Sequence, residues 1–324
     1  MRRQDISIWT LLVILALTYT AQSGTELVAP TTADRALADQ ANKLIQAAKG
    51  TPAQEQLNFL SNDWVSGLLK LLGSTNPVSP GNLDFARKTI TESVETIGKA
   101  STWPRPSKVI VPYTSTPPVI DGKLDDAAWA KAVTFTNSYA FNKREPLTKP
   151  LTTWKILWDK DYLYFAFDCE DEDIIAPILP RDDMPFQYDS VEIFLLPDFR
   201  QGMYWELVIG ATGSIYDGLN AKKFTGWGAL TRTTENIEGL KVGTHVDGTP
   251  NKSGDKDKRY IVEVAVPFKE LPSYTRGNPP QKGDILCFML ARMNKDGDVF
   301  TPIAVFPLLS WGHNIWNYAP MELD

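Results

Sequence analysis

Histidine and cysteine are scarce in this chain, which has only two of each among its 324 residues. Two cysteines are too few for a thiolate zinc cage or an iron–sulfur cluster, and two histidines leave little room for a histidine-based metal site or proton shuttle. The sequence has no Cys-x-x-Cys-His motif, so covalently attached haem is excluded. It also has no Gly-x-Ser-x-Gly nucleophile elbow and no phosphate-binding P-loop. Chemistry at a functional site therefore has to come mainly from carboxylates, amides and aromatic rings.

Positive charge is in the minority, because 33 Lys and Arg residues face 39 Asp and Glu residues, for a formal net charge of −6. An acidic chain is not expected to have a phosphate backbone as its main partner, which argues against nucleic acid. The fractions of hydrophobic residues, 43%, and charged residues, 22%, are typical of globular proteins. The length predicts one large domain or two ordinary ones.

The chain has no apolar run long enough to span a bilayer, which takes about 20 residues. Its apolar stretch at residues 8–17 follows an Arg-Arg pair and precedes the small residues 21–23. This order is typical of a secretory signal peptide over residues 1–23, and an uncleaved anchor is the alternative. We expect a secreted or periplasmic protein with no stable membrane span after cleavage. An oxidising compartment would allow Cys169 and Cys287 to pair, and buried free thiols are the alternative.

Helical periodicity dominates residues 24–102. Apolar residues recur at i, i+3 and i+4 from Leu37 to Ala48, and two further amphipathic stretches occupy residues 57–72 and 85–97. Each stretch is followed by a glycine, which is a common helix stop. No residues here have catalytic spacing. We therefore expect a small bundle, or helices that pack on the next domain or on a protein partner through residues 31–100.

The chain changes character after residue 102. Residues 103–116, which open with Trp-Pro-Arg-Pro, are expected to form a proline-rich linker. From residue 117 to 324, β-branched and aromatic runs alternate with turn residues, and no helical stretches lie between them. We therefore expect an all-β sandwich, immunoglobulin-like or jelly-roll-like, preceded by a small α-helical segment. The clearest runs are residues 154–158, 162–169, 190–196, 204–209, 260–266, 285–293 and 299–306.

Three of these runs each carry one glutamate opposite an apolar row. Alternation along a strand places Glu192, Glu206 and Glu263 on the faces opposite Val191, Trp205 and Val262, respectively. A solvated outer face would explain this pattern. The functional interpretation is a polar face whose carboxylates accept hydrogen bonds from vicinal hydroxyl groups.

Aromatic residues are the second ingredient, since the chain has ten tryptophans. Trp227, Trp311 and Trp316 lie in segments that look like loops, where a large ring is harder to bury. An exposed indole suits the apolar face of a sugar ring. Flat rings together with carboxylates and amides indicate carbohydrate binding, although any single loop tryptophan is more often a packing residue.

Five stretches occur in the order and spacing of family 9 carbohydrate-binding modules. They are Pro-Pro-Val-Ile-Asp-Gly-Lys-Leu-Asp-Asp-Ala-Ala-Trp-Ala at residues 117–130, Lys-Ile-Leu-Trp-Asp-Lys-Asp-Tyr-Leu-Tyr at 155–164, Asp-Ser-Val-Glu-Ile-Phe at 189–194, Tyr-Ile-Val-Glu-Val-Ala-Val-Pro at 260–267 and Tyr-Ala-Pro-Met-Glu-Leu at 318–323. The chain resembles this family over about residues 115–324. The resemblance implies a β-sandwich that binds oligo- or polysaccharide without cleaving it, in the setting of polysaccharide utilisation.

The resemblance also implies which residues bind the sugar. Glu192 matches a family glutamate that accepts hydrogen bonds from sugar hydroxyls. Phe186 stands where typical members have one tryptophan of a sugar clamp, and Trp311 or Trp316 matches the second. Glu206 stands where the family has an arginine. The implied carbohydrate-binding set is Phe186, Glu192, Glu206, Trp311, His313, Asn314 and Trp316.

Structural calcium is usual in this family. The acidic turn at the end of the run 162–169 offers oxygen ligands in Asp168, Asp171 and Asp173, with a solvated acidic loop as the alternative. Arg292 either replaces the family's arginine or forms a structural ion pair.

Other functions have less support. Residues 187–192 resemble the Glu-x-Asp-x-x-Glu strand of retaining β-glucanases, but the nucleophile position holds Gln187. Hydrolysis is therefore not expected. A haem held between Met and His ligands, with His245 and His313 as candidates, is one alternative function. A structural or partner-docking module without a sugar ligand is the other.

Overall fold

The computed structural model of the chain divides into two units. The described residues are 27–47, 63–100, 103–104, 106–198, 203–221, 231–232, 236–252, 254–271, 280–309, 312–313 and 315–324. The first unit contains the described residues up to 100, and the second begins at Trp103. The expected signal peptide, residues 1–23, lies outside the described residues.

The first unit contains three helices, α2 (Thr32–Ala47), α4 (Asp63–Gly73) and α5 (Pro80–Ala100). Their apolar faces pack on one another around Leu72, Leu83 and Ile90, as helical periodicity predicts. Asp34 accepts hydrogen bonds from the backbone and hydroxyl of Thr31 at the start of α2, and it pairs with Arg87 of α5 at 2.6 Å. An ion pair between the buried Asp34 and the partly exposed Arg87 thus ties the first helix to the third. Within the described residues, no helix is long and apolar enough to cross a membrane.

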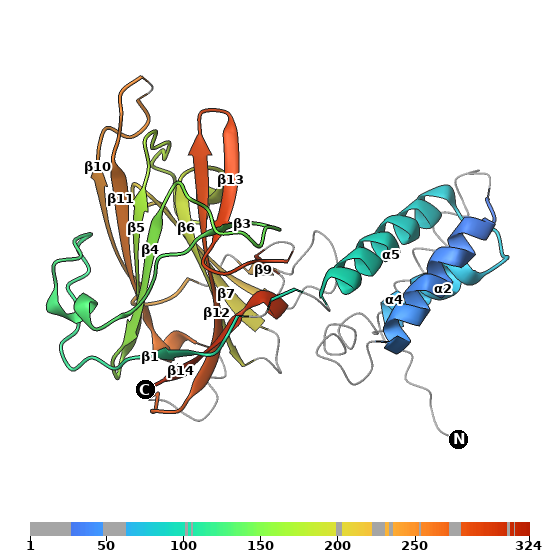
Figure 1. The fold of residues 1–324 in the computed structure, drawn as a ribbon, viewed down its shortest axis with the longest axis horizontal. Coiled ribbons are helices and arrows are strands. Elements are labelled where there is room, and N and C mark those ends of the chain that lie inside the picture. The colour runs from blue at the N-terminus through green and yellow to red at the C-terminus, as the bar shows by residue number, and fades with distance from the viewer. Residues whose placement is uncertain are drawn as a thin grey trace. The chain divides into compact units, whose positions relative to one another are not determined.

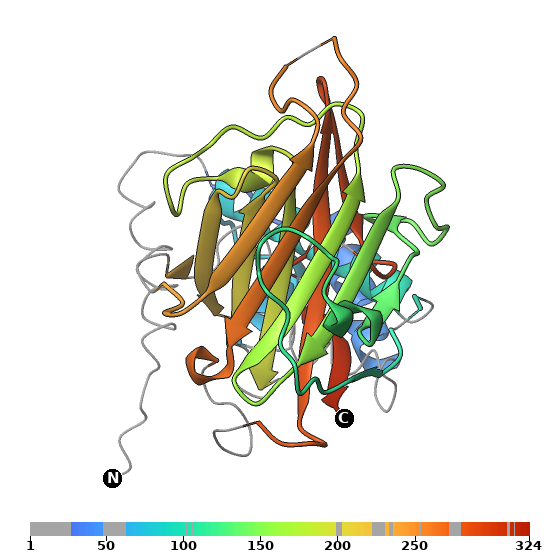
Figure 2. The same ribbon diagram turned by 90° about the vertical axis from the view of Figure 1, so that its left-hand side faces the viewer.

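The second unit is a sandwich of two β-sheets (Figures 1 and 2), which confirms the predicted fold class. One sheet has nine strands in the described residues, in the order β1-β14-β12-β6-β7-β8-β9, with β13 paired to β12 and β3 paired to β13. The other has five strands, in the order β10-β11-β5-β4-β2. The strands of the larger sheet are β1 (Val109–Val111), β3 (Tyr139–Ala140), β6 (Ser190–Asp198), β7 (Met203–Gly210), β8 (Ile215–Ala221), β9 (Thr231–Arg232), β12 (Ile285–Asp296), β13 (Val299–Ala304) and β14 (Ala319–Leu323). Those of the smaller sheet are β2 (Val133–Phe135), β4 (Thr152–Trp158), β5 (Tyr162–Glu170), β10 (Lys241–Asp247) and β11 (Arg259–Pro267).

The main core lies between the two sheets and follows the predicted alternation. Val191 and Leu207 of the larger sheet pack with Phe165 and Val262 of the smaller one. Each strand buries every second residue here, so its intervening residues point to the opposite face of their sheet. Short 3₁₀ turns, η2 (Ala127–Ala130), η3 (Pro185–Gln187), η4 (Phe268–Glu270) and η5 (Ile315–Asn317), join several strands.

Residues 103–116, which were expected to form a linker, are partly built into the sandwich. Val109–Val111 forms β1, which pairs in parallel with β14 at the edge of the larger sheet. The indole N–H of Trp103 donates to the Pro307 carbonyl. The segment is thus attached to the sandwich, because its Val-Ile-Val run supplies a strand that its prolines do not interrupt.

Both cysteines are free thiols in the structure. Cys169 is buried in the core between the sheets, whereas Cys287 lies among residues on the other face of the larger sheet. Burial raises the pKa of the Cys169 thiol to about 12 and that of Cys287 to about 11. Neither is therefore an activated thiolate at neutral pH.

Candidate functional site

The outer face of the nine-stranded sheet, the face turned away from the smaller sheet, carries the predicted glutamate pair. Antiparallel pairing sets Glu192 of β6 opposite Val208, and Phe194 opposite Glu206 of β7. Glu192 and Glu206 therefore lie on one face as diagonal neighbours on adjacent strands. Tertiary pairing thus brings together two carboxylates that are 14 residues apart in the chain.

Both carboxyl groups are largely buried, with relative exposures of 5% for Glu192 and 7% for Glu206. Burial raises the pKa of Glu192 well above its ordinary value, and the neighbouring Glu206 carboxylate raises it further. The site thus holds one carboxyl that favours its neutral form beside a second one. A neutral acid donates a hydrogen bond, whereas a carboxylate only accepts.

Glu206 is held by polar partners on neighbouring strands and on the last loop. Its Oε2 accepts a hydrogen bond from Nδ2 of Asn220 in β8 at 2.9 Å. Its Oε1 lies 3.5 Å from Nε2 of His313. The other ring nitrogen of His313, Nδ1, is 2.8 Å from the Tyr204 hydroxyl. These contacts fix His313 over the sheet face beside the glutamate.

Apolar side chains surround this polar group. Phe186, on η3, is half-buried and packs against the apolar cluster of this face, which includes Phe194, Tyr204, Met289 and Tyr318. Gly312 lets the loop before β14 lie close against the larger sheet. A Cβ on this residue would be 2.8 Å from the Met289 side chain and 3.0 Å from the Phe194 side chain. The absence of that Cβ lets the loop bring His313 to the sheet.

The structure brings together four of the seven predicted carbohydrate-binding residues: Phe186, Glu192, Glu206 and His313. Trp311 and Asn314 lie outside the described residues, as does the side chain of Trp316. The second wall of the predicted clamp therefore stays a prediction. Sequence reasoning missed Tyr204 and Asn220 as partners of the site, although Tyr204 shares the strand parity of Glu206.

The prediction that Glu263 shares this polar face is wrong. Glu263 belongs to the five-stranded sheet, and its side chain is fully buried. Its Oε2 accepts hydrogen bonds from the backbone N–H groups of Asp121 and Gly122, and its Oε1 accepts one from the Trp129 indole. The residue holds the chain segment before β2 onto its sheet and is not open to a ligand.

The three aspartates expected to hold calcium do not form one site. Asp168 pairs with Arg259 at 3.0 Å, Asp171 pairs with Arg292 at 2.8 Å, and Asp173 accepts a hydrogen bond from the Gly297 backbone. Within the described residues, no group of three or more His, Cys, Asp or Glu side chains is arranged to hold a metal ion. Each of the three aspartates thus has another partner, and calcium binding by them stays a prediction.

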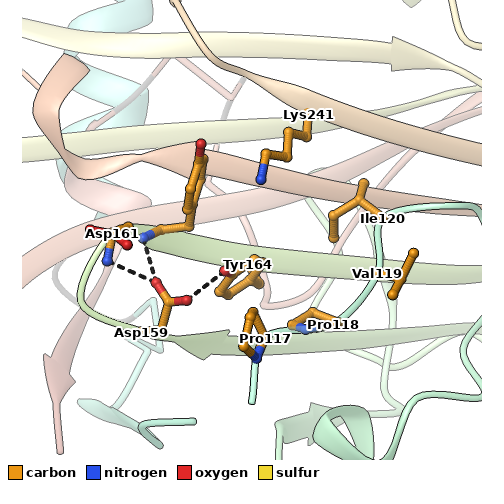
Figure 3. Close-up of a pocket in the computed structure, with 9 residues that line it drawn as sticks. Pro117, Pro118, Val119, Ile120, Asp159, Asp161, Tyr164 and Lys241 are labelled. Carbon is orange, nitrogen blue, oxygen red and sulfur yellow. Dashed lines mark hydrogen bonds between the residues drawn. The ribbon is translucent and has the colours of Figure 1, made fainter. Parts of the chain in front are cut away.

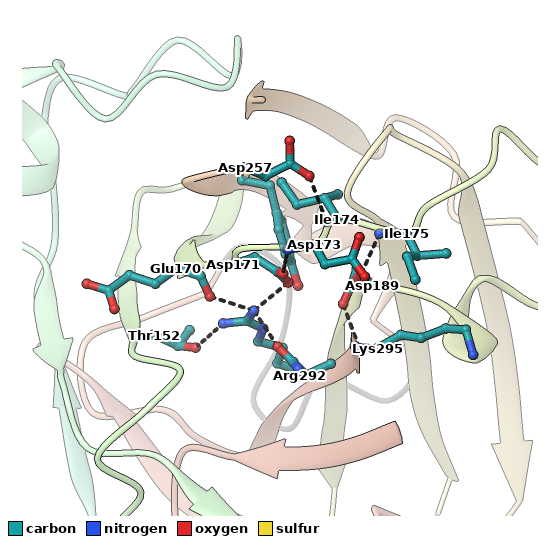
Figure 4. Close-up of polar contacts among 12 residues, drawn as sticks. Thr152, Glu170, Asp171, Asp173, Ile174, Ile175, Asp189, Asp257, Arg292 and Lys295 are labelled. Atoms are coloured by element: carbon teal, nitrogen blue, oxygen red, sulfur yellow. Dashed lines mark hydrogen bonds and ion pairs between the residues drawn. The ribbon is translucent and has the colours of Figure 1, made fainter. Parts of the chain in front are cut away.

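Arg292 lies beside Asp171 and donates hydrogen bonds to several acceptors around it (Figure 4). It is fully buried, and its guanidinium donates to the Asp171 carboxylate, the Glu170 carbonyl and the Asn294 amide oxygen. Burial raises the pKa of Asp171, and the Arg292 charge opposes that shift. Of the two roles open to Arg292 from the sequence, the structure supports the ion pair.

The buried state of Glu192 makes stability depend on pH. Because its pKa is higher in the folded protein, the folded state keeps a proton that the unfolded chain loses above about pH 4.3. The contribution of Glu192 to stability therefore falls as pH rises from that value toward the folded pKa. We expect Glu192→Gln to raise the unfolding midpoint in urea more at pH 8 than at pH 5. Equal effects at both pH values would contradict this assignment, and Glu145→Gln in an exposed loop is the matched control.

Comparison with known proteins identifies the family. Residues 120–302, more than half of the chain, match the model described as "Carbohydrate family 9 binding domain-like". The chain belongs to this family. The match spans the strands that carry Glu192 and Glu206.

Two curated proteins match part of the chain. Endo-1,4-beta-xylanase A of Thermoanaerobacterium saccharolyticum is 29% identical over 179 residues, which is 55% of this chain. Exoglucanase XynX of Acetivibrio thermocellus is 30% identical over 167 residues, which is 52% of this chain. The matched region is 13% of the length of each relative, so it corresponds to one part of those larger proteins.

Solved structures share the sandwich. A candidate carbohydrate-binding protein from Bacteroides uniformis aligns with a TM-score of 0.55 and 11% identity, covering 67% of this chain and 99% of that one. A family 9 module from Caldicellulosiruptor kristjanssonii in complex with cellotriose aligns with a TM-score of 0.45 and 19% identity, covering 67% of this chain and 94% of that one. The first of these likenesses supports the fold.

Proposed function

We propose that the sandwich binds carbohydrate without cleaving it, through the outer face of the nine-stranded sheet. The observation that carries this proposal is the diagonal pair Glu192 and Glu206 beside the half-buried ring of Phe186. Carboxyl groups accept hydrogen bonds from sugar hydroxyls, and the phenyl ring offers a flat apolar surface for the C–H face of a pyranose. Family membership supports the same ligand class. So do two structures described as a family 9 module from Caldicellulosiruptor kristjanssonii, one in complex with cellotriose and one with glucose.

The surroundings of Glu206 favour tight and specific binding of a sugar. Asn220 and His313 orient the Glu206 carboxylate, which leaves less rotamer freedom to be lost when a ligand binds. We expect Trp311 or Trp316 to supply the second ring of the clamp. Affinities between micromolar and millimolar, about −8 to −4 kcal/mol, are expected for sugar binding of this kind.

The setting of this function is also a proposal. The apolar N-terminal stretch predicts export to the periplasm or beyond, where oligo- and polysaccharides are met. The matched relatives, a xylanase and an exoglucanase, support a role in polysaccharide utilisation alongside enzymes that cleave the chains.

Haem binding has less support than sugar binding. Both ring nitrogens of His313 contact protein groups, so ligation of iron would require breaking the contact with Tyr204 or with Glu206. The other histidine, His245, lies on the five-stranded sheet. A Soret band in the purified protein would overturn the sugar-binding proposal in favour of this alternative.

Removal of the Phe186 ring tests the proposed site. We expect Phe186→Ala to weaken binding of cello- or xylo-oligosaccharides about tenfold in calorimetric titration, because the sugar loses its flat apolar contact. Phe85→Ala, which removes a phenylalanine from helix α5 of the other unit, is the control and should bind as the wild type does. Unchanged affinity in Phe186→Ala, or no binding of any oligosaccharide by the wild type, would reject the proposal.

A further inference from the structure

A hollow lies on the outer face of the five-stranded sheet, the face opposite the core (Figure 3). Its volume is about 370 Å³, near the lower end of the range for small-ligand pockets. One side is formed by residues 117–120, and the floor and other side by Tyr162, Tyr164, Asp159 and Lys241. It uses none of the residues of the Glu192–Glu206 face.

The first wall of this hollow is fixed in place. The segment of residues 117–122, which we call the strap, crosses the sheet over β10 and β11. Its Asp121 and Gly122 amides both donate to the buried Glu263 carboxylate, at 3.0 and 2.7 Å. Gly243 of β10 lets the strap lie directly on the strand, since a Cβ there would be 2.6 Å from the Gly122 nitrogen. The hollow beside the strap is thus held open before any ligand arrives, which lowers the cost of binding.

Some polar groups at this hollow already have hydrogen-bond partners within the protein, and others can still bind a ligand. Asp159 accepts hydrogen bonds from the backbones of Asp161 and Tyr162 and from the Tyr164 hydroxyl, so it shapes the floor. The Lys241 ammonium lies 4.4 Å from the centroid of the Tyr162 ring, and no carboxylate of the described residues forms an ion pair with it. The exposed Asp161 binds Lys160 through Oδ2, which leaves Oδ1 as an acceptor.

These groups select a class of ligand. The prolines of the strap and the tyrosine rings offer apolar surfaces, while Lys241 donates and Asp161 accepts hydrogen bonds. One ammonium near carboxylates of opposite charge favours neither an anion nor a cation. A ring with an apolar face and hydroxyls that both donate and accept satisfies every one of these groups.

We propose that this hollow is a second saccharide site, which takes one neutral pyranose unit and uses Lys241 as its principal hydrogen-bond donor. The proposal goes beyond the function assigned to the Glu192–Glu206 face and does not require that face to bind. Two sites on the opposite outer faces of one sandwich would let the module hold two sugar chains, or two parts of one chain. Simultaneous binding would raise retention on polysaccharide without any new contact.

The experiment is a titration of the full-length, ¹⁵N-labelled protein with glucose, xylose, mannose and galactose. Amide shifts of Asp161, Tyr162 and Lys241 report on the hollow, and those of Phe194 and Glu206 report on the other face. We expect at least one sugar to shift the amides of the hollow saturably. Lys241→Met, which keeps a flexible chain beside Tyr162 but removes the donor, should weaken that binding at least tenfold and leave the other face unchanged. Lys131→Met, an exposed lysine that does not line the hollow, is the matched control.

The outcomes separate this inference from the proposed function. Shifts confined to Phe194 and Glu206, or equal binding at the hollow in Lys241→Met, would overturn the second site and leave the proposed function standing. Shifts confined to the hollow would support the second site and reject the Glu192–Glu206 face. An absence of shifts at both places would reject both. Because Lys241 is an exposed side chain, its replacement should leave the fold intact.

Discussion

Replacing Arg292 with methionine is expected to lower the free energy of unfolding of the sandwich by about 3–5 kcal/mol, the cost of breaking a buried ion pair by removing one partner. The guanidinium is fully buried and donates to Asp171, Asn294 and the Glu170 carbonyl. Methionine fills a similar volume but leaves the Asp171 carboxylate without its cation and removes every hydrogen bond that the guanidinium donates. Urea unfolding followed by tryptophan fluorescence measures the loss.

Two further variants separate the buried charge from ordinary side-chain loss. Arg259→Met removes the exposed ion pair with Asp168 and should cost less than about 1 kcal/mol. Adding Asp171→Asn to Arg292→Met should recover part of the stability, since the unpaired charge is then gone. If Arg292→Met were no more destabilising than Arg259→Met, the buried ion pair between Arg292 and Asp171 would not be a major source of the sandwich's stability.

The second large effect is expected where the strap crosses the smaller sheet. A Cβ at residue 243 would lie 2.6 Å from the Gly122 nitrogen, 2.7 Å from the Asp121 nitrogen and 2.7 Å from the Ile120 carbonyl carbon. These are backbone atoms and cannot rotate away, so Gly243→Ala has to lift the strap. We expect a loss of about 3 kcal/mol, at the upper end of overpacking costs, because the hydrogen bonds to Glu263 lengthen as well. Calorimetric melting measures the loss, and hydrogen exchange should show faster exchange of the Gly122 amide.

Gly210→Ala is the control for this prediction. Residue 210 also lies at a strand, at the end of β7, but the nearest atom to a Cβ there would be the Ser214 Cβ at 3.4 Å, which is an ordinary contact. Its effect should stay within about 1 kcal/mol. Equal effects at residues 210 and 243 would contradict the close packing of the strap. We also expect Gly243→Ala to weaken sugar binding at the hollow beside Lys241, because the strap forms one wall of that hollow.

Several elements could be predicted from local pattern alone. Alternation in the runs around Val191, Trp205 and Val262 predicts which side chains face the core, and the structure confirms each of them. The order of five motifs predicts the family, which the match over residues 120–302 confirms. Both inferences work because each signal lies within a short stretch of chain, where backbone geometry sets the side-chain direction.

Shorter strands escaped prediction. Val109–Val111 and Tyr139–Ala140 are too short to show a period, and they form strands because a partner strand is available at the edge of the larger sheet. Lys241–Asp247 contains four polar or charged residues and a glycine, yet it pairs along its length with β11. Pairing with a neighbour that is already ordered outweighs weak strand propensity.

The sequence by itself determined the alternation of its strands, the helical segment before them, the family and the residue types able to meet a sugar. Only the tertiary structure decided that Glu192 and Glu206 share a face while Glu263 is buried on the other sheet, and that Arg292 forms an ion pair with Asp171. The physical reason is that the direction of a side chain follows from its own strand. Its neighbours follow from hydrogen bonding between strands that are distant in the chain.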